Sequence, residues 1–362
     1  MSAHGTSAPP AAVRPARISL SPSRRAWLRF RANRRGLLSL WIFLALFVAS
    51  LGAELLSNDR PIVVSYEGSL YWPLVRTYPE TAFGGDFRTP ADYLDPFIRE
   101  RITSGGNWAL YPPNSYSFDT INYFAPSPDP APPSSANLLG TDDRGRDVLA
   151  RLVYGFRLSV LFALALTAVG TLIGIAAGAV QGYFGGAVDL YFQRFIELWS
   201  GMPQLYLLII LASVIEPSFW VLLTFLLLFS WMGLTGVVRA EFLRGRNLDY
   251  VRAAKALGVS DAVVMFRHIL PNAMVATLTF LPFILAGSVT VLVSLDFLGF
   301  GLPPGSPSLG ELVNQGKDNL TAPWLALTGF FVLGTMLTLL TFIGEAVRDA
   351  FDPRKLPGGG RR

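Results

Sequence analysis

The sequence predicts an all-α membrane protein with six transmembrane helices and an aromatic-rich insertion between the first two. Of its 362 residues, 51% are hydrophobic and only 15% are charged, whereas a soluble domain has about 25% charged residues. A transmembrane helix needs about 20 mostly apolar residues. Six stretches of roughly this length or longer lack Asp, Glu, Lys and Arg: 36–53, 158–188, 198–215, 217–238, 271–295 and 319–344.

The first transmembrane helix is predicted over residues 36–56. A cleaved signal peptide is the alternative interpretation, because small residues occur at 49–53. However, the apolar stretch is longer than the about 7 to 15 residues typical of a signal peptide, and 35 residues precede it, which is too many for the basic segment that starts one. We therefore expect this helix to remain in the protein.

Basic residues are concentrated in segments that six spans would place on one side of the membrane. Residues 1–35 contain eight arginines and no acid, 239–268 contain six basic residues against three acids, and the tail from 345 contains five against three. Residues 57–150 instead contain seven basic and twelve acidic residues. Because cytoplasmic loops are enriched in Lys and Arg, we expect 1–35 and the tail 351–362 in the cytoplasm. The net charge of +5 is thus a topology signal, and no nucleic-acid partner is expected.

Residues 57–139 form a long outer segment between the first two helices. Its aromatic residues between 66 and 124 make it too apolar for a disordered tail, so we expect it to fold. Five prolines between 126 and 133 predict an extended linker. Two roles stay open for this insertion: a passive cap on the outer membrane surface, or the docking of a partner or ligand.

Residues 140–156 are predicted to form an amphipathic helix in the membrane interface. Thr141 or Asp142 would cap its start, where acids suit the positive end of the helix dipole. A divalent-cation site at Asp142, Asp143 and Asp147 is the alternative, but the spacing is not that of an EF-hand and the intervening arginines oppose a cation. No metal is expected. The apolar residues on one face of this helix are Val148, Leu149, Leu152, Val153 and Phe156.

The second span carries glycines at a spacing of four residues. This spacing puts them on one ridge of a helix, which lets another helix approach closely. We expect the ridge to serve helix packing, and a pore-lining role is the alternative. The four residues are Gly170, Gly174, Gly178 and Gly182.

Ionisable residues border several spans. Asp189, Asp296, Glu345 and the pair Arg194 and Glu197 all lie near predicted span ends. An ionisable residue inside a membrane is a functional candidate, but at a span end we expect the side chain to reach the interface. None of these residues is expected to bind substrate.

Residues 247–271, between the fourth and fifth spans, predict a pair of short helices on the basic side. Asp249 can cap the first helix, which Gly258 ends. Ser260 can cap the second, and Pro271 either stops it or starts the next helix.

The first of these short helices has a surface suited to docking. Three alanines, Ala253, Ala254 and Ala256, leave a narrow surface that another protein can approach closely, while Tyr250 and Leu257 lie on one face. We therefore predict an intermolecular docking site. A hairpin that merely connects two spans is the alternative.

This segment resembles the coupling-helix loop of binding-protein-dependent ATP-binding cassette (ABC) importers. That loop has Glu-Ala-Ala, a glycine four positions after the last alanine, and a later Ile-x-Leu-Pro or Ile-Leu-Pro ending. Arg252 stands where the family usually has glutamate, so this chain lacks the carboxylate at that position. The residues that the resemblance assigns to ATPase coupling are Arg252, Ala253, Ala254, Gly258, Ile269, Leu270 and Pro271.

Further motifs resemble the peptide/nickel branch of these importers. The resemblance covers residues 137–354 almost continuously, and the long insertion after the first span is similar to that of the microcin C-type oligopeptide importer subunit. The matching motifs are 139–149, 182–189, 294–301, 322–325 and 348–354.

The resemblance implies the type I ABC importer permease fold, with its core at 157–350, in a bacterial inner membrane. It implies one of two permease subunits, forming a heterodimer that translocates peptides or peptide-like compounds. The other partners would be two cytoplasmic ATPase domains, which bind ATP and Mg²⁺, and a periplasmic substrate-binding protein. The chain itself would be no enzyme and hold no cofactor.

Other functions have less support in the sequence. Within the family, nickel or another non-peptide solute is the alternative cargo, and a receptor or exporter subunit is the alternative outside it. An intramembrane hydrolase lacks its motif, because His268 is followed by Ile-Leu-Pro-Asn and the chain has no HExxH helix. With no cysteine in the chain, thiolate chemistry is excluded. Periodicity does not identify substrate-binding residues.

Overall fold

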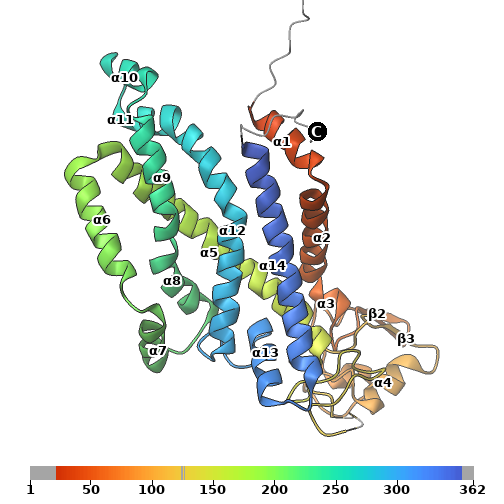
Figure 1. Ribbon diagram of the computed structural model, residues 1–362. Coiled ribbons are helices and arrows are strands. Elements are labelled where there is room, and N and C mark those ends of the chain that lie inside the picture. The colour runs from red at the N-terminus through yellow and green to blue at the C-terminus, as the bar shows by residue number, and fades with distance from the viewer. Residues whose placement is uncertain (1–21, 124, 126, 353–362) are drawn as a thin grey trace, which may run out of the picture.

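The protein is seen in a computed structural model that describes residues 22–352 except 124 and 126. Much of the predicted segment 1–35 and nearly all of the tail 351–362 lie outside the described residues. The described part is a bundle of long helices with a small unit of strands and short helices at one end (Figure 1). The bundle contains α1 (Pro22–Ala32), α2 (Arg34–Leu51), α3 (Ala53–Leu56), α5 (Val148–Phe184), α6 (Gly186–Ser200), α7 (Gln204–Val214), α8 (Phe219–Ser230), α9 (Met232–Gly245), α10 (Asp249–Ala256), α11 (Asp261–Val263), a π-turn η2 (Val264–Ile269), α12 (Leu270–Phe297), α13 (Leu309–Asp318) and α14 (Pro323–Phe351).

The number of spans agrees with the sequence. Among the described residues, five helices are long and apolar enough to cross a membrane, and a sixth span results if the bent pair α6 and α7 is one crossing. A helix suits this role because it satisfies its own backbone hydrogen bonds, which lipid cannot do. The five are Arg34–Leu51, Val148–Phe184, Phe219–Gly245, Asp261–Phe297 and Pro323–Phe351.

The predicted third span is broken. The prediction placed one helix over 198–215, extending back toward residue 190, but α6 and α7 meet at an angle of 68° across a short break. Pro203 lies in this break and precedes α7. Proline lacks the N–H that would continue the helical ladder and disfavours helical backbone in the residue before it, so the helix ends and restarts here.

The prediction of a separate interfacial helix over 140–156 is wrong. α5 starts at Val148 and continues for 37 residues, and its cap is Asp147, whose side chain accepts from the Ala150 N–H, rather than Thr141 or Asp142. The apolar face seen in the sequence is the first part of this long helix. Three of its five residues, Val148, Leu152 and Phe156, pack into the core with residues of α12, α13 and α14.

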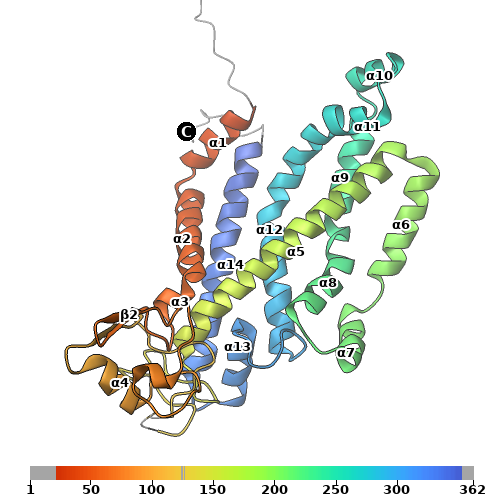
Figure 2. The same cartoon turned by 180° about the vertical axis from the view of Figure 1, so that it is seen from behind.

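The insertion folds into a unit of its own beside the outer end of α2 (Figures 1 and 2). It contains an antiparallel sheet in the order β2-β1-β3, and half of its core residues are aromatic, so the segment folds as its composition led us to expect. Its elements are β1 (Val63–Tyr66), β2 (Ser69–Tyr71), a 3₁₀ turn η1 (Glu80–Phe83), α4 (Pro96–Thr103) and β3 (Trp108–Leu110). Its core residues are Val64, Tyr66, Phe83, Tyr93, Ile98 and Ile102.

The glycine ridge of α5 lies directly against the end of α8 and against α9. A β-carbon added to any of the four glycines would come within 2.5–2.7 Å of an oxygen atom there, which is far closer than van der Waals contact. The absence of side chains is therefore what allows these helices to approach. The facing oxygen atoms are Ser230 Oγ for Gly170, Trp231 O for Gly174, Thr235 O for Gly178 and Arg239 O for Gly182.

We predict that Gly178→Ala lowers the free energy of unfolding by about 1–3 kcal/mol, the usual effect of overpacking a tight contact. The added methyl would lie 2.6 Å from Thr235 O and 2.8 Å from Val238 Cβ. Thermal unfolding of the purified chain in detergent measures the effect. Gly236→Ala on α9 is the matched control, because a β-carbon there meets no atom within 4 Å, and we expect it to raise stability through better helix propensity. Equal effects of the two substitutions would contradict the role of the ridge.

Candidate functional site

The segment 247–271 projects beyond the inner ends of α9 and α12 (Figures 1 and 2). Asp249 is the first residue of α10 rather than its cap, and Leu248 precedes it without a capping side chain. Gly258, with a φ of +81°, ends α10 in the left-handed conformation that glycine adopts without strain. Ser260 stands before α11 but makes no capping hydrogen bond.

Pro271 does not stop the helical run in which it lies, and it comes just after the start of α12. α11, the π-turn η2 and α12 follow one another without a break, so the second predicted short helix is the beginning of a span. Pro271 lies in the first turn of α12, directly after η2, so the N–H that proline lacks falls at the junction of these two helical segments.

The residues assigned to ATPase coupling occupy two kinds of position. Ile269 is buried and belongs to the cluster that anchors the segment on α5 and α9, together with Val251 of α10. The others lie at or near the surface: Arg252, Ala253, Gly258 and Pro271 are exposed, and Ala254 and Leu270 are half-buried.

The outward face of α10 has unpaired apolar surface. Leu257 is 85% exposed and Tyr250 is 44% exposed, while Ala253 between them is small. Val251 on the opposite side is fully buried. α10 is therefore anchored through Val251. Its other face presents the protruding apolar side chain of Leu257 beside the small Ala253, which suits contact with a second protein.

A polar cluster ties this segment to the inner end of α5. The Tyr183 hydroxyl donates a short hydrogen bond to Asp261 Oδ1, and Lys255 Nζ lies 3.4 Å from the same oxygen. The Lys255 ammonium also lies 4.6 Å from the centre of the Tyr183 ring. Arg246 donates to the Tyr183 carbonyl oxygen at 3.1 Å. We call Tyr183, Lys255 and Asp261 the inner latch, because they connect α5, α10 and α11.

A cleft of about 810 Å³ opens beside α10, between α9, α12 and the end of α14. Acidic and basic side chains both line this cleft. Its residues include Glu241, Arg244, Tyr250, Asn272, Arg348 and Asp349.

Two acids at span ends do not reach out to the interface as expected. Asp189 of α6 accepts two hydrogen bonds, at 2.5 and 2.6 Å, from the Arg239 guanidinium of α9. Asp296 is only 7% exposed and accepts from Ser308 Oγ at 2.6 Å and from the Leu302 N–H at 2.7 Å. Short acidic side chains reach less far than Lys or Arg, so a local donor satisfies them instead.

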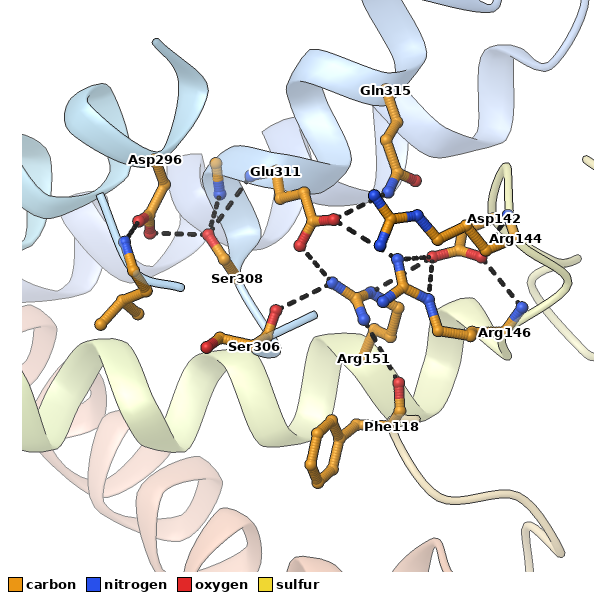
Figure 3. Close-up of polar contacts among 12 residues, drawn as sticks. Phe118, Asp142, Arg144, Arg146, Arg151, Asp296, Ser306, Ser308, Glu311 and Gln315 are labelled. Carbon is orange, nitrogen blue, oxygen red and sulfur yellow. Dashed lines mark hydrogen bonds and ion pairs between the residues drawn. The ribbon is translucent and has the colours of Figure 1, made fainter. Parts of the chain in front are cut away.

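A buried ionic cluster occupies the outer end of α5 (Figure 3). The Arg151 side chain is 0% exposed and lies 2.5 Å from Glu311 Oε2 on α13. It also donates to the carbonyl oxygens of Ser306, at 2.9 Å, and of Phe118 in the insertion, at 3.3 Å. A buried guanidinium needs such partners, because burial removes its hydration. One side chain thus joins α5, α13 and the insertion.

The turn 140–147 completes this cluster, which we call the outer cluster: Asp142, Arg146, Arg151 and Glu311. Arg146 contacts Asp142 Oδ2 at 2.6 Å and reaches Glu311 at 3.4 Å. Two of the three carboxylates considered for a cation are engaged locally: Asp142 is paired with arginine, and Asp147 accepts from Asn114 at 2.7 Å and from Asn137 at 2.9 Å. The third, Asp143, is exposed. Burial raises the pKa of the Asp147 carboxyl, and these amide donors oppose the rise.

Sequence reasoning missed the key residues of both clusters. Tyr183 and Glu311 are far along the chain from their partners, and only contact in the fold reveals them. Arg151 did carry a signal: a charged residue inside the apolar run from Val148 to Val153 requires a partner, as an ionisable group in such a setting usually does.

Two family models and several known proteins match this chain. Residues 170–357 match the family model described as binding-protein-dependent transport system inner membrane component, and residues 21–68 match the N-terminal TM domain of oligopeptide transport permease C. The chain is 60% identical over 337 residues to the inner membrane ABC transporter permease protein YejE of Escherichia coli, covering 93% of this chain and 98% of that protein.

Two further relatives extend this comparison. The peptidoglycan transport system permease protein YejE of Agrobacterium fabrum is 54% identical, covering 95% of this chain and 96% of that protein. The oligopeptide transport system permease protein OppC of Lactococcus lactis is 37% identical, over 62% of this chain and 78% of its own length. The insertion therefore falls within the alignment with both YejE proteins.

We predict that Glu311→Gln lowers the free energy of unfolding by about 1.5–3 kcal/mol, because it weakens a charge-assisted hydrogen bond to the buried Arg151 guanidinium, while Asp142 Oδ2 remains 3.5 Å from Arg151 Nε. Thermal or denaturant unfolding in detergent measures the loss. Lys317→Gln on the same helix is the control: its pair with Asp318 is about 60% exposed on both sides, and exposed pairs contribute about 0–1 kcal/mol. A loss no larger for Glu311→Gln than for Lys317→Gln would show that Arg151 finds compensation elsewhere.

Proposed function

Because the chain belongs to the family of binding-protein-dependent transport system inner membrane components, we propose that it is a permease subunit of an ATP-driven importer of peptides or peptide-like compounds. Relatives named for oligopeptide and peptidoglycan transport support this class of cargo. The chain is a multi-pass inner membrane protein of this family, and its role is to form the path, not to catalyse a reaction.

The proposal includes the partners of such a transporter. A substrate-binding protein delivers cargo to the outer side, where the insertion lies, and two ATPase domains work on the cytoplasmic side. We propose that a second, different permease subunit completes the pathway. ATP and Mg²⁺ bind to the ATPase domains and not to this chain. The basic segments support cytoplasmic placement of both termini.

The exposed face of α10 is the observation that most directly supports docking of an ATPase domain. Ala253 and Leu257 are exposed, and Tyr250 is half-exposed with its hydroxyl donating to the His268 carbonyl oxygen at 3.3 Å, on a short helix that the buried Val251 anchors. An ATPase domain that docks there and then moves on ATP binding pulls α10 with it. The inner latch passes that movement to α5, which reaches the outer cluster and α13 at the other side of the membrane. Such a change is a rigid-body rearrangement of packed helices.

We predict that Leu257→Asp abolishes capture of the ATPase subunits and peptide uptake while the chain still folds and inserts. The charge would replace an apolar side chain that is 85% exposed. We therefore expect the substitution to weaken ATPase binding and to leave folding of the chain intact. Co-purification of ATPase subunits and uptake of a labelled peptide panel into cells measure the two effects.

Leu320→Asp is the matched control. Leu320 is 84% exposed but lies between α13 and α14, at the other end of the bundle from α10, and we expect its variant to keep capture and uptake. Unchanged capture by Leu257→Asp would contradict docking at α10. Uptake of nickel ions without uptake of any peptide would contradict the proposed cargo but leave the docking site intact.

We predict that Tyr183→Phe lowers the number of peptides imported per ATP hydrolysed several-fold while ATPase capture is unchanged. The substitution removes only the hydroxyl that joins α5 to Asp261, so α10 still docks but transmits its movement less well. Peptide uptake and ATP hydrolysis in the same proteoliposomes give the ratio. Tyr191→Phe, on an exposed part of α6, is the control. A normal ratio in Tyr183→Phe would exclude the inner latch from coupling.

A further inference from the structure

The small sheet of the insertion has two contrasting faces. On one face, Val64 and Tyr66 of β1 are buried at 0% and 8% exposure against α4 and η1. This face forms the core of the insertion. Because side chains alternate along a strand, the neighbouring residues Val63 and Ser65 point to the opposite face.

The opposite face is apolar and uncovered. Strand register pairs Ser65 with both Leu70 and Trp108, and Val63 with Leu110, so these side chains share that face. Leu70, Trp108 and Leu110 are 59%, 51% and 54% exposed, and Trp72, two residues beyond Leu70, is 49% exposed. None of the strand residues is charged. A sheet face that met water would normally be polar, so this face requires a partner.

The arrangement of the insertion turns this face toward the membrane. α4 packs on the buried face of the sheet through Ile98 and Ile102. In Figures 1 and 2, which share one vertical axis, the sheet lies at a level between α3 and α4, and α4 lies farther from α2. The apolar face is opposite α4, and thus faces back toward the end of the bundle where α2 leaves the membrane.

The apolar face is also close to lipid-exposed surface along the chain. Leu51, Leu55 and Leu56 at the outer end of α2 and in α3 are 40–51% exposed. β1 begins at Val63, seven residues after Leu56, a distance of at most about 25 Å even when fully extended. Both views place the sheet to the side of α3, away from α14 and beyond the outer end of α2, next to the region where lipid would surround α2.

We infer that the face formed by Leu70, Trp72, Trp108 and Leu110 rests on the outer leaflet of the phospholipid bilayer. Tryptophan suits this position, because its ring is mostly apolar and its N–H can meet the headgroup region. A soluble binding protein would approach from the water, where it meets the α4 side of the insertion and not this face. The inference depends on α2 crossing the membrane and is independent of the cargo.

Single cysteines placed by substitution test this contact, because the natural chain has none. Leu70→Cys and Leu110→Cys each carry a spin label on the apolar face, and Glu100→Cys carries one on the exposed side of α4. The full chain, with its transporter subunits, is reconstituted in vesicles of phosphatidylethanolamine and phosphatidylglycerol. Collision of the label with oxygen, which concentrates in lipid, is compared with collision with a water-soluble nickel chelate.

We expect the labels at 70 and 110 to collide several-fold more with oxygen than with the chelate, and the label at 100 to show the reverse. Both labelled positions on the face are half-exposed, so neither substitution removes a core contact. The same water-like behaviour at all three positions would overturn the inference. Weak collision with both reagents at 70 and 110 would overturn it as well, because it indicates burial against protein rather than lipid.

Discussion

The unbroken course of α5 is the constraint on which the structure depends. In a bilayer, a break in a helix leaves backbone groups without partners, so a spanning helix is strongly favoured to continue. The 37 residues of α5 rise by about 1.5 Å each and reach about 55 Å, which exceeds the thickness of the apolar core. Both ends of α5 therefore emerge from the membrane, with the outer cluster at one and the inner latch at the other. Because α5 is one continuous helix, a displacement of one end moves the other end as well.

The two ends of α5 are held by different chemistry. At the outer end, the Arg151 side chain is fully buried and Glu311 is 23% exposed, so removing the carboxylate partner of the buried guanidinium is costly. Asn114 and Asn137 add neutral donors to the Asp147 cap, which fastens the insertion to the start of the helix. At the inner end, Lys255 and Asp261 are about half-exposed, and such contacts are weak individually. The outer end of α5 is thus held more firmly than the inner end.

Sequence patterns predicted features that repeat along one helix. They missed contacts between residues that are far apart in the chain. The ridge from Gly170 to Gly182 is visible in the sequence because its spacing matches the surface of a helix. The five helices that are long and apolar enough to cross a membrane are visible in the composition in the same way, whereas the break between α6 and α7 is not. The contact of Tyr183 with Asp261 joins residues 78 positions apart, and no local pattern encodes it. The misread helix at 140–156 has the same origin, since an apolar face predicts burial but not whether lipid or other helices supply it.

The charged residues of α6 determine how the membrane voltage acts on it. Its three charged residues all have partners: Asp189 pairs with Arg239 of α9, and Arg194 pairs with Glu197 at 2.6 Å. Moving one elementary charge through a potential of 100 mV takes about 2.3 kcal/mol, but each of these pairs is electrically neutral. A displacement of α6 that keeps both pairs together transfers no net charge across the field. The voltage then performs no work on this bent span, and its position is decided by the contacts that it makes.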